Sequence, residues 1–567
     1  MEDAISVAAP RRRGLLSKAL RDARAYTPTR VEMGMAFLSG ALLILSFPDL
    51  NLWPLAWVGL VPVLVVVARR AESGAGFVLG WLTGVLFFYG SCYWLTYSMI
   101  RYGHLPPLIA YLLLIIPVVI VSLFPALCMA VLARAVKRWG GRALFAAPFL
   151  WAALEWARLG LTGQLWNAIG YSQAYHPSLI QTARWGGVYL VGFLILLVNS
   201  AIAFLVLKRS MRAMLTTLAV MAFVFLNIFF TSRLSEPENT DAKFSDKPDA
   251  VVVAVQPNVP MEPVDSEAET KALVERHLSL SESALQAWDH RRVRVAEISS
   301  AAIEPPKNSR LIDNPKQLPI KGDVPRVVIW PESPMSFTYA RDSEFRELVA
   351  RFTSKNHTSV IFNSLEPAPL GGAYNAAVMV NEEGRLVAQY DKIRLLPFGE
   401  YVPVPRWLPG ASLIPVMVGD FTPGAEYILM PVGEARAGVF ICFESAFPSI
   451  ARRFADEGAD VLINISNDGY LGPTPVMRQH LANVVFRAVE NGRPILRVTN
   501  TGISAYINAR GEVSDATAGF QTAVRTWTVK RAAQGKTFYT MYGDVFAWAC
   551  AALSFLVLGL TLRRPTV

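Results

Sequence analysis

Long apolar stretches alternate with mixed segments along this chain of 567 residues. A membrane-spanning helix needs about 20 predominantly apolar residues. Eight stretches meet this need at least approximately, and they cover residues 33–50, 53–69, 76–98, 106–136, 143–160, 184–207, 212–232 and 544–562. The fourth is overlong and contains Pro117 and Pro125, so we expect it to tilt or kink. The pattern predicts a bundle of eight membrane helices.

The segment between the seventh and eighth stretches predicts one large domain outside the membrane. It has mixed composition and no spanning stretch. The predicted organisation is a basic tail over 1–32, seven helices over 33–232, a globular domain over 233–543, an eighth helix over 544–562 and a short tail over 563–567.

Within the globular domain, short apolar runs typical of buried strands alternate with helical patterns. The runs cover 250–258, 327–330, 359–362, 437–441, 461–465 and 495–498, and the helical patterns cover about 266–288, 342–355, 446–457 and 475–491. Residues 381–384 predict a hairpin turn. Residues 290–325 are rich in Pro, Lys and Asn, so we expect an irregular insertion there. Strands that alternate with helices and hairpins indicate a layered α/β domain with a large buried sheet.

Lysine and arginine set the expected orientation in the membrane, because they favour the cytoplasmic side. The loops near 51 and 101 are almost free of them, whereas they gather in the N-terminal tail, at 69–70, 134–142 and 208–212, and at 563–564. Both tails are therefore predicted to be cytoplasmic and the 233–543 domain to lie on the outer side. Membrane anchoring explains the net charge of +10, so we expect no nucleic-acid partner. With 53% hydrophobic residues the chain is too apolar for an ordinary soluble enzyme.

Cys442 is the only cysteine in the predicted outer domain, since Cys92, Cys128 and Cys550 fall in apolar stretches. A thiol without a disulfide partner in its own chain is inert, intermolecular or reactive. Cys442 closes a predicted strand and precedes a helix expected to start near Ala446. We expect the helix amides to favour its thiolate, which supports a reactive cysteine.

Two other strand ends carry charged residues suited to work with a thiol. Glu332 follows the run that ends in Trp330-Pro331, and Lys392 follows Asp391. A carboxylate can take the thiol proton, an ammonium can stabilise the thiolate and an oxyanion, and the thiol can attack a carbonyl. Each residue alone is as well explained by packing or a surface salt bridge, but the three together favour acyl transfer. The histidines show no metal-ligand spacing, and no phosphate-binding glycine loop or zinc pattern is present, so we expect no metal and no cofactor.

The segments around Glu332, Lys392 and Cys442 resemble the nitrilase superfamily of carbon–nitrogen hydrolases over about 250–535. With the flanking helices, the chain is similar to the apolipoprotein N-acyltransferase family. The further matching motifs cover 396–403, 464–472, 479–480 and 487–491. The chain departs from some relatives in lacking a tryptophan after Gln256-Pro257-Asn258, and its 290–325 segment is longer than expected.

This resemblance implies an αββα sandwich and a Glu-Lys-Cys triad. Glu332 is then the general base, Lys392 the stabiliser of the oxyanion, and Cys442 the nucleophile that forms a thioester. Glu400 orients Lys392, and Glu444 supports the site. The implied reaction moves an acyl chain from a phospholipid to the cysteine and then to the α-amino group of a lipoprotein's diacylglyceryl-cysteine. It implies a bacterial inner-membrane protein whose catalytic domain is periplasmic, surrounded by membrane lipid.

Three more residues are candidates for substrate binding, each with an alternative. Trp166, in a predicted outer loop, suits an interfacial anchor or a lipid headgroup site. Trp407 lies in the apolar stretch 404–421, which we interpret as a mobile lid or equally as a buried loop. Asn467 suits a pocket lining or ordinary turn chemistry. His480 is expected to be a hydrogen-bonded structural residue rather than a general base.

Glu155 and Arg158 lie three residues apart near the outer end of the fifth predicted helix. Charges at membrane depth point to function by default, but a structural ion pair is the favoured interpretation over a substrate contact. Two rival functions also stay open. One is a membrane-tethered amidase of the same superfamily, and the other is a transporter or scaffold whose outer domain only binds a ligand.

Overall fold

The structure, a computed structural model, describes residues 27–234, 248–261, 266–301, 324–332, 334, 337–369, 371–402, 420–532 and 535–563, with the backbone alone over 291–301. Most of the predicted tail 1–32, most of the stretch 404–421 with Trp407, and residues 302–323 of the predicted insertion lie outside these ranges.

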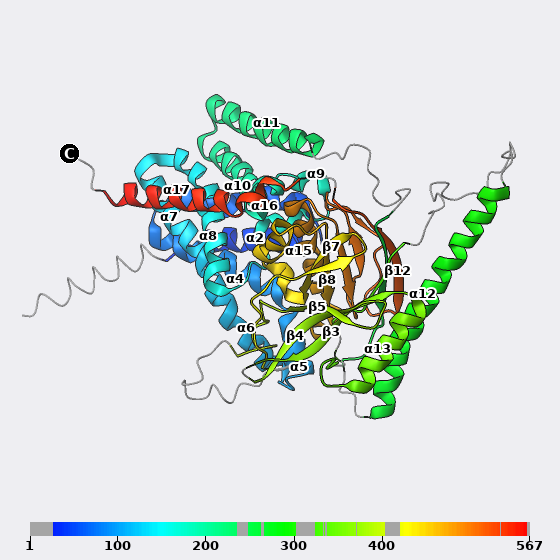
Figure 1. The fold of residues 1–567 in the computed structure, drawn as a ribbon. Helices are drawn as coiled ribbons and strands as arrows, with labels where there is room; N and C mark the ends of the chain where they lie inside the picture. Colours follow the sequence, from blue (N-terminus) through cyan, green and yellow to red (C-terminus); the bar gives the residue numbers. More distant parts are fainter. Residues whose placement is uncertain are drawn as a thin grey trace, which may run out of the picture.

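The first part of the chain and its C-terminal end are helical (Figure 1). The α-helices there are α2 (Arg30–Ser46), α3 (Val61–Arg70), α4 (Ser73–Cys92), α5 (Leu95–Arg101), α6 (Pro107–Val121), α7 (Leu123–Trp139), α8 (Ala147–Thr162), α9 (Pro177–Ile180), α10 (Ala183–Lys208), α11 (Met211–Leu234), α16 (Phe538–Tyr542) and α17 (Val545–Leu562). Within the described ranges, six helical stretches are long and apolar enough to cross a membrane. One of the six, Pro107–Thr162, includes α6, α7 and α8, and α2 is not among them.

The overlong apolar stretch 106–136 forms two helices. The expected kink is a break at Ser122, between α6 and α7. Pro125 lies in the first turn of α7, where a proline is tolerated because that position has no intrahelical partner for an N–H.

Helices α4 and α7 pack closely because of a row of glycines. Gly76, Gly80 and Gly84 follow one another at intervals of four, and each faces α7. A methyl group on Gly80 would collide with the backbone of Pro125 and Ala126. Small residues let helix backbones approach in lipid, where burial of apolar side chains alone does not drive association.

The domain between α11 and α16 contains two six-stranded sheets. Their strand orders are β12-β1-β2-β3-β4-β5 and β11-β10-β9-β8-β7-β6. The bounds are β1 (Ala250–Gln256), β2 (Arg326–Ile329), β3 (Ser359–Pro367), β4 (Ala373–Val380), β5 (Leu386–Asp391), β6 (Leu429–Val432), β7 (Ala435–Ile441), β8 (Val461–Ser466), β9 (Ile495–Thr499), β10 (Ala505–Ile507), β11 (Val513–Ser514) and β12 (Ala523–Val529). Strands β1–β2–β3 and β7–β8–β9 are parallel, and the other pairs are antiparallel.

The helices of this domain connect the parallel strands. They are α12 (Glu267–Ala301), α13 (Ser343–Asn356), α14 (Pro448–Asp456) and α15 (Val476–Asn491). All six predicted apolar runs are strands, and the 381–384 turn joins β4 to β5. Helix α12 continues to Ala301, so the expectation of an irregular segment is wrong for residues 290–301. Residues 290–301 contain no proline, and their charged and apolar side chains are compatible with a helix.

Burial on both faces explains why β1 is a continuous apolar run. Val252 and Ala254 belong to one core cluster and Val253 and Val255 to another, as expected for side chains that alternate across a sheet. The second cluster includes Val349 of α13. On the other face, β1 contacts β9 and β4 contacts β7, so the two sheets lie against one another.

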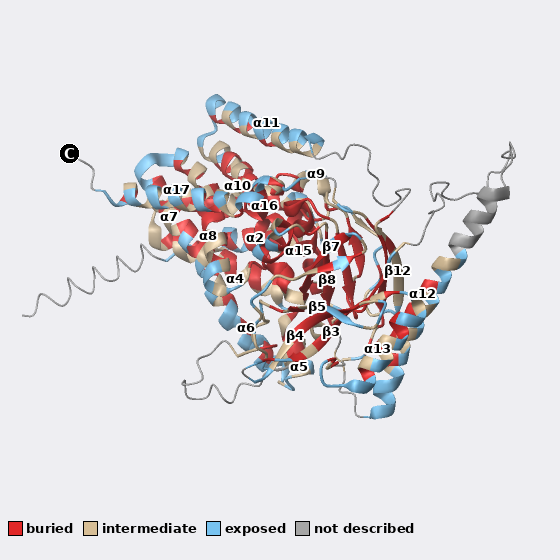
Figure 2. Cartoon of the chain, in the orientation of Figure 1, coloured by how far each residue is buried: buried red, intermediate tan, exposed pale blue. Residues whose placement is uncertain are grey.

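One apolar core continues from the membrane helices into the second sheet. The same cluster of buried residues contains Leu43 and Val191 of the bundle, Val439 of β7 and Phe486 of α15. The buried residues are concentrated where α10 packs on α15 and in the two sheets (Figure 2). The globular domain is therefore built onto the bundle rather than tethered beside it.

A break in α10 adds a polar connection at this junction. The backbone leaves the helical conformation at Gly186 and Gly187, and Gly187 has φ +65°. A side chain on Gly187 would meet the ring of Tyr539. The N–H of Val188, which restarts the helix, donates to Glu490 of α15 at 3.0 Å.

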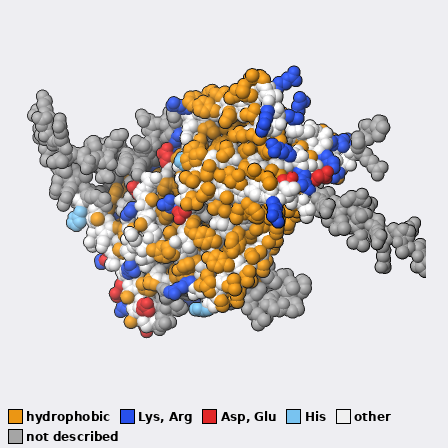
Figure 3. Space-filling model, turned by 180° about the vertical axis from the view of Figure 1, so that it is seen from behind, with side chains coloured by type: hydrophobic (Ala, Val, Ile, Leu, Met, Phe, Trp, Pro, Cys, Tyr) orange, Lys and Arg blue, Asp and Glu red, His pale blue; other side chains and the backbone are white. Residues whose placement is uncertain are grey.

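Apolar side chains cover one broad face of the molecule, and Lys and Arg gather along its border (Figure 3). Exposed apolar residues are frequent on α6, α11 and α17, for example Ile116, Phe225 and Phe555. Such a face suits contact with lipid rather than with water.

Candidate active site

Cys442 lies at the carboxyl end of β7, in a backbone conformation rare for residues with a side chain. Its φ is +53°, and it begins a short 3-10 turn over Cys442–Ala446. A left-handed conformation costs about 1–2 kcal/mol for a residue with a Cβ, so the surrounding structure must hold it.

The expectation that helix amides favour the Cys442 thiolate is wrong. The α-helix that follows, α14, begins only at Pro448, because the 3-10 turn intervenes. Burial raises the pKa of the thiol, the negative charge of Glu332 raises it further, and Lys392 opposes both. The resting cysteine is therefore a thiol, and thiolate formation requires a base.

Lys392 follows β5 and is buried between two carboxylates. Its Nζ lies 2.8 Å from Oε1 of Glu400 and 3.6 Å from Oε1 of Glu332, and its side chain is 1% exposed. Burial acts to lower the pKa of Lys392, but the charges of Glu400 and Glu332 outweigh it and raise the pKa. The Lys392 ammonium therefore keeps its charge although its side chain is buried.

Asn375 joins the two carboxylates and was missed in the sequence. Its Nδ2 donates to Oε1 of Glu332 at 3.0 Å and to Oε1 of Glu400 at 2.7 Å. Its Oδ1 accepts from Asn363 at 2.7 Å, which fixes the orientation of the amide. The sequence signal that could have identified Asn375 is the presence of two amide side chains, Asn363 and Asn375, in the otherwise apolar strands β3 and β4.

Glu444 connects the Lys392 segment with the Cys442 turn. Its Oε1 accepts from the Tyr390 hydroxyl at 2.8 Å and from the backbone N–H groups of Ile393 and Arg394 at 2.8 and 3.0 Å. Its Oε2 accepts from the N–H of Ile441 at 2.8 Å. Burial raises the pKa of Glu444, and these hydrogen bonds and Lys392 oppose the shift. The carboxylate holds two strand ends from different sheets together.

The three candidate substrate-binding residues have different positions. Trp166 is buried at the junction, where its ring stacks on Phe443 with centroids 6.0 Å apart. Asn467 is buried, and its Oδ1 accepts from the N–H of Gly469 at 3.1 Å, so it supports the turn after β8. Trp407 lies outside the described residues.

Glu155 and Arg158 have separate partners. Oε1 of Glu155 accepts from the Trp151 indole at 2.9 Å and from the N–H of Ile169 at 2.8 Å. Arg158 donates to the backbone oxygen of Trp166 at 2.8 Å and lies 5.1 Å from the centre of the Phe88 ring. The favoured interpretation of a mutual ion pair is therefore not what the structure has.

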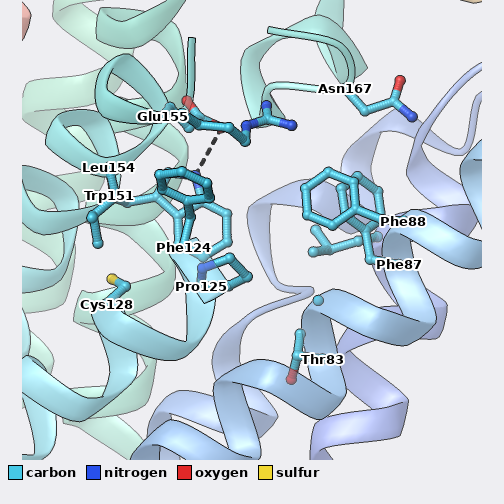
Figure 4. A pocket seen from close by; sticks show the side chains of 13 residues that line it. Thr83, Phe87, Phe88, Phe124, Pro125, Cys128, Trp151, Leu154, Glu155 and Asn167 are labelled. Atoms are coloured by element: carbon cyan, nitrogen blue, oxygen red, sulfur yellow. Dashed lines mark hydrogen bonds between the residues drawn. The ribbon is translucent and has the colours of Figure 1, made fainter. Parts of the chain in front are cut away.

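Both charged residues line a cavity inside the bundle (Figure 4). It lies between α2, α4, α7 and α8, and most of its lining is apolar. The labelled rings of Phe87, Phe88, Phe124 and Trp151 surround it, with Glu155 at one end. None of Glu332, Lys392 and Cys442 lines this cavity.

The geometry around Cys442 supplies the parts of a nucleophilic acyl-transfer site. Glu332 raises the pKa of the Cys442 thiol and Lys392 lowers it, and these two charged groups lie 3.6 Å apart. Over the described ranges, no group of three or more His, Cys, Asp or Glu side chains is arranged to hold a metal ion. The chemistry available from these side chains is proton transfer, nucleophilic attack and oxyanion stabilisation.

Comparison with known proteins gives two family matches and related full-length sequences. Residues 39–201 match the family described as apolipoprotein N-acyltransferase N-terminal domain, and residues 255–537 match carbon-nitrogen hydrolase. An apolipoprotein N-acyltransferase of Geobacter metallireducens is 34% identical over 549 residues, which cover 94% of this chain and 96% of that protein. One of Chlorobaculum tepidum is 28% identical over 536 residues, with 92% and 94% covered. Among solved structures, a mutant of the amidase from Nesterenkonia sp. AN1 is 14% identical, covers 54% of this chain and 98% of that chain, and has a TM-score of 0.33.

Proposed function

This chain belongs to the apolipoprotein N-acyltransferase family, and from this premise we propose that it transfers an acyl chain from a phospholipid to a lipoprotein through a thioester on Cys442. It is an acyltransferase of lipoprotein biosynthesis with a nitrilase-like domain, and the family favours acyl transfer over amide hydrolysis. The observation that carries the cysteine mechanism is the buried Lys392 ammonium between Glu332 and Glu400, because the charges of Lys392 and Glu332 both act on the Cys442 thiol.

In the first half-reaction, Glu332 takes the proton of the Cys442 thiol as Sγ attacks the ester carbonyl of the phospholipid. Lys392 stabilises the oxyanion of the tetrahedral intermediate. The ester C–O bond then breaks, and the leaving lysophospholipid oxygen receives the proton from Glu332. The acyl chain remains on Sγ as a thioester.

In the second half-reaction, the α-amine of the diacylglyceryl-cysteine attacks the thioester carbonyl. Glu332 accepts a proton from the amine, the C–S bond breaks, and the proton returns to Sγ. Glu400 keeps Lys392 charged and in place, since its carboxylate lies only 2.8 Å from Nζ. Glu444 fixes the strand ends that carry Lys392 and Cys442.

The topology we infer has eight membrane helices, with helices one to seven in 33–232, a catalytic αββα sandwich in 233–543 and the last helix in 544–562. The contacts between the two sheets and the helices that connect their strands support the sandwich. The six apolar stretches support a bundle of several spanning helices. The count of eight takes α2 as the first helix and α6 with α7 as one crossing.

The two ends of the bundle differ in charge and in neighbours. At one end Lys137 pairs with Glu72 at 2.9 Å, and Arg138 donates to the backbone of Arg563 at 2.6 Å. At the other end, Ser98 donates to the backbone of Tyr470 in the globular domain. Because basic ends favour the cytoplasm, this supports a periplasmic catalytic domain in a bacterial inner membrane, with the acyl donor and the lipoprotein reaching it from the outer leaflet.

Intact mass spectrometry of the full chain in phospholipid micelles tests the mechanism. We expect wild type to gain the mass of one acyl chain, and digestion to locate it on Cys442. A diacylated lipopeptide should then remove it and itself become triacylated. Cys442→Ala should acquire no adduct. Full transfer activity in Cys442→Ser would contradict the thioester, and an adduct that water but not the lipopeptide removes would indicate an amidase-like hydrolase instead.

A further inference from the structure

His480, in α15, holds the backbone oxygen of the nucleophile residue. Its Nε2 lies 3.0 Å from the carbonyl oxygen of Cys442, and its Nδ1 lies 2.8 Å from Oδ1 of Asp468. The side chain is 4% exposed. Both neighbours are hydrogen-bond acceptors, so the ring is held between them from its two nitrogens.

Asp468 is itself fixed as a carboxylate. Burial acts to raise its pKa, but the charges of Arg497 and His480 outweigh this and lower it to about 2. Arg497 donates to Oδ2 at 2.9 Å, and a methyl group on Gly502 would collide with the same oxygen. The acceptor at Nδ1 therefore has a fixed position, and it fixes the plane of the His480 ring.

Gln479 is the residue before His480, and its side-chain amide is bound by the membrane part of the chain. Its Oε1 accepts from the indoles of Trp94 at 3.1 Å and Trp166 at 2.9 Å. Its Nε2 donates to the backbone oxygens of Pro48 at 3.2 Å and Ser91 at 3.0 Å. All four hydrogen-bonding positions of the amide are used, and two donors against two acceptors allow only one orientation.

These partners come from three separate segments of the bundle. Pro48 follows α2, Ser91 and Trp94 lie where α4 meets α5, and Trp166 lies in the loop after α8. The Trp166 ring also lies 5.7 Å from the His480 ring and stacks on Phe443, the residue after the nucleophile. Gln479 and His480 are adjacent in the chain. A shift of any of these segments therefore moves His480 and, with it, the Cys442 turn.

We propose that Gln479 and His480 are positioning residues through which the membrane bundle sets the backbone of Cys442 and the direction of its thiol. The inference rests on the proposed function of Cys442 as the nucleophile. It gives the bundle a part in catalysis beyond holding the enzyme in the membrane: Gln479 fixes α15 against three membrane segments, and His480 fixes the left-handed residue that carries the thiol.

Two substitutions of His480 separate its two hydrogen bonds. His480→Gln places an amide nitrogen near the position of Nε2 and keeps a donor for the Cys442 carbonyl. His480→Asn places it near Nδ1 and keeps only the Asp468 contact. The readout is the rate at which iodoacetamide alkylates Cys442 in the full chain, followed by digestion and mass mapping, because this small reagent needs no lipid site.

We expect His480→Asn to slow alkylation of Cys442 and formation of the acyl adduct by at least about tenfold, since misplacement of a reacting atom strongly reduces rate. His480→Gln should retain rates within about threefold of wild type. The apparent affinity for phospholipid should be unchanged in both. Equal alkylation rates in the two variants and wild type would overturn the role of His480.

Gln479→Glu tests the connection to the bundle, because it keeps the length of the side chain and removes both donors. Arg478→Gln is the matched control, since Arg478 is largely exposed and forms one ion pair with Asp49 at 3.2 Å. We expect Gln479→Glu to slow Cys442 alkylation about tenfold although Gln479 does not touch the nucleophile turn, and Arg478→Gln to leave it unchanged.

A double variant, Gln479→Glu with His480→Asn, should lose little more than either single variant, because both act through one path. A lower unfolding temperature in Gln479→Glu with unchanged alkylation and acylation rates would show a merely structural role and overturn the proposal. If even wild type forms no acyl adduct, the thioester mechanism fails, while the alkylation rates still decide whether the bundle positions this thiol.

Discussion

The ammonium of Lys392 forms a 2.8 Å ion pair with the carboxylate of Glu400, and both side chains are almost completely buried. Glu332 lies farther from the same ammonium, at 3.6 Å, and is the more exposed carboxylate. The two glutamates therefore differ in what they can do: one holds the charge of Lys392, and the other remains accessible for proton transfer.

We predict that Glu400→Gln destabilises the protein by about 3 kcal/mol, because a buried ammonium loses its nearest counter-charge. Acyl-adduct formation should also fall, since the pKa of Lys392 drops and its oxyanion-stabilising charge weakens. Thermal unfolding in detergent measures the first effect. The matched control is Glu282→Gln, which breaks an exposed Lys–Glu pair of 3.0 Å and should change stability by less than about 1 kcal/mol.

Glu332→Gln should change two properties of Cys442 in opposite directions. Glu332 raises the pKa of the thiol, so its removal lowers that pKa and increases the thiolate fraction at a given pH. The alkylation rate of Cys442 at pH 8 should therefore rise, and its pH profile should move to lower pH. Acyl transfer should fall by about 100-fold or more, because no base remains to take the proton. A parallel decrease of both rates would argue against Glu332 as the base.

Glu444→Gln should destabilise the protein more than Tyr390→Phe. An amide cannot accept at both ends, so at least one buried backbone N–H loses its partner, which costs about 1–3 kcal/mol. Tyr390→Phe removes one of the four hydrogen bonds and leaves the three backbone contacts. Hydrogen exchange at Ile393 or at Ile441, whichever faces the amide nitrogen, should increase in Glu444→Gln only. Equal exchange in the two variants would show that the carboxylate does not join these strand ends.

Cys442→Gly should be more stable than Cys442→Ala by up to about 1 kcal/mol, although glycine usually weakens a fold. The reason is the φ of +53° at this position, which glycine adopts without strain. The control is Ala437→Gly in the same strand, where the backbone is extended and glycine should destabilise by about 1 kcal/mol. Thermal unfolding of the three variants gives the comparison, and a less stable Cys442→Gly would exclude strain at the nucleophile.

The alternation of apolar runs and helical patterns was enough to predict the strands of both parallel sets and the four helices that connect them. The pattern failed where its signal is weak: α12 extends to Ala301 through residues with no clear apolar period. It also could not show that 106–136 is two helices, since a proline in the first turn of a helix looks the same in sequence as one that kinks it.

Glu332 and Lys392 were predicted because they follow apolar runs at strand ends, whereas Glu400 and Glu444 came only from the family resemblance. Their relations are tertiary and were not predictable: Asn375 reaches Glu332 and Glu400 from a neighbouring strand, and Glu444 connects two sheets. The left-handed conformation of Cys442 has no sequence signal, because cysteine rarely adopts it. His480 was expected to be structural, and the structure places its ring in contact with the backbone carbonyl of Cys442.

The apolar core shared by Leu43, Val191, Val439 and Phe486 has a consequence for engineering. Excising 233–543 to obtain a soluble enzyme would strip α15 of its neighbours and expose the side chains that now pack on α10. Surfactant could cover such a surface, but it cannot replace the carbonyls of Pro48 and Ser91 or the indoles of Trp94 and Trp166 that orient Gln479. We therefore expect the excised domain to lose the positioning of Cys442, and screening for inhibitors to need the membrane segments that bind Gln479.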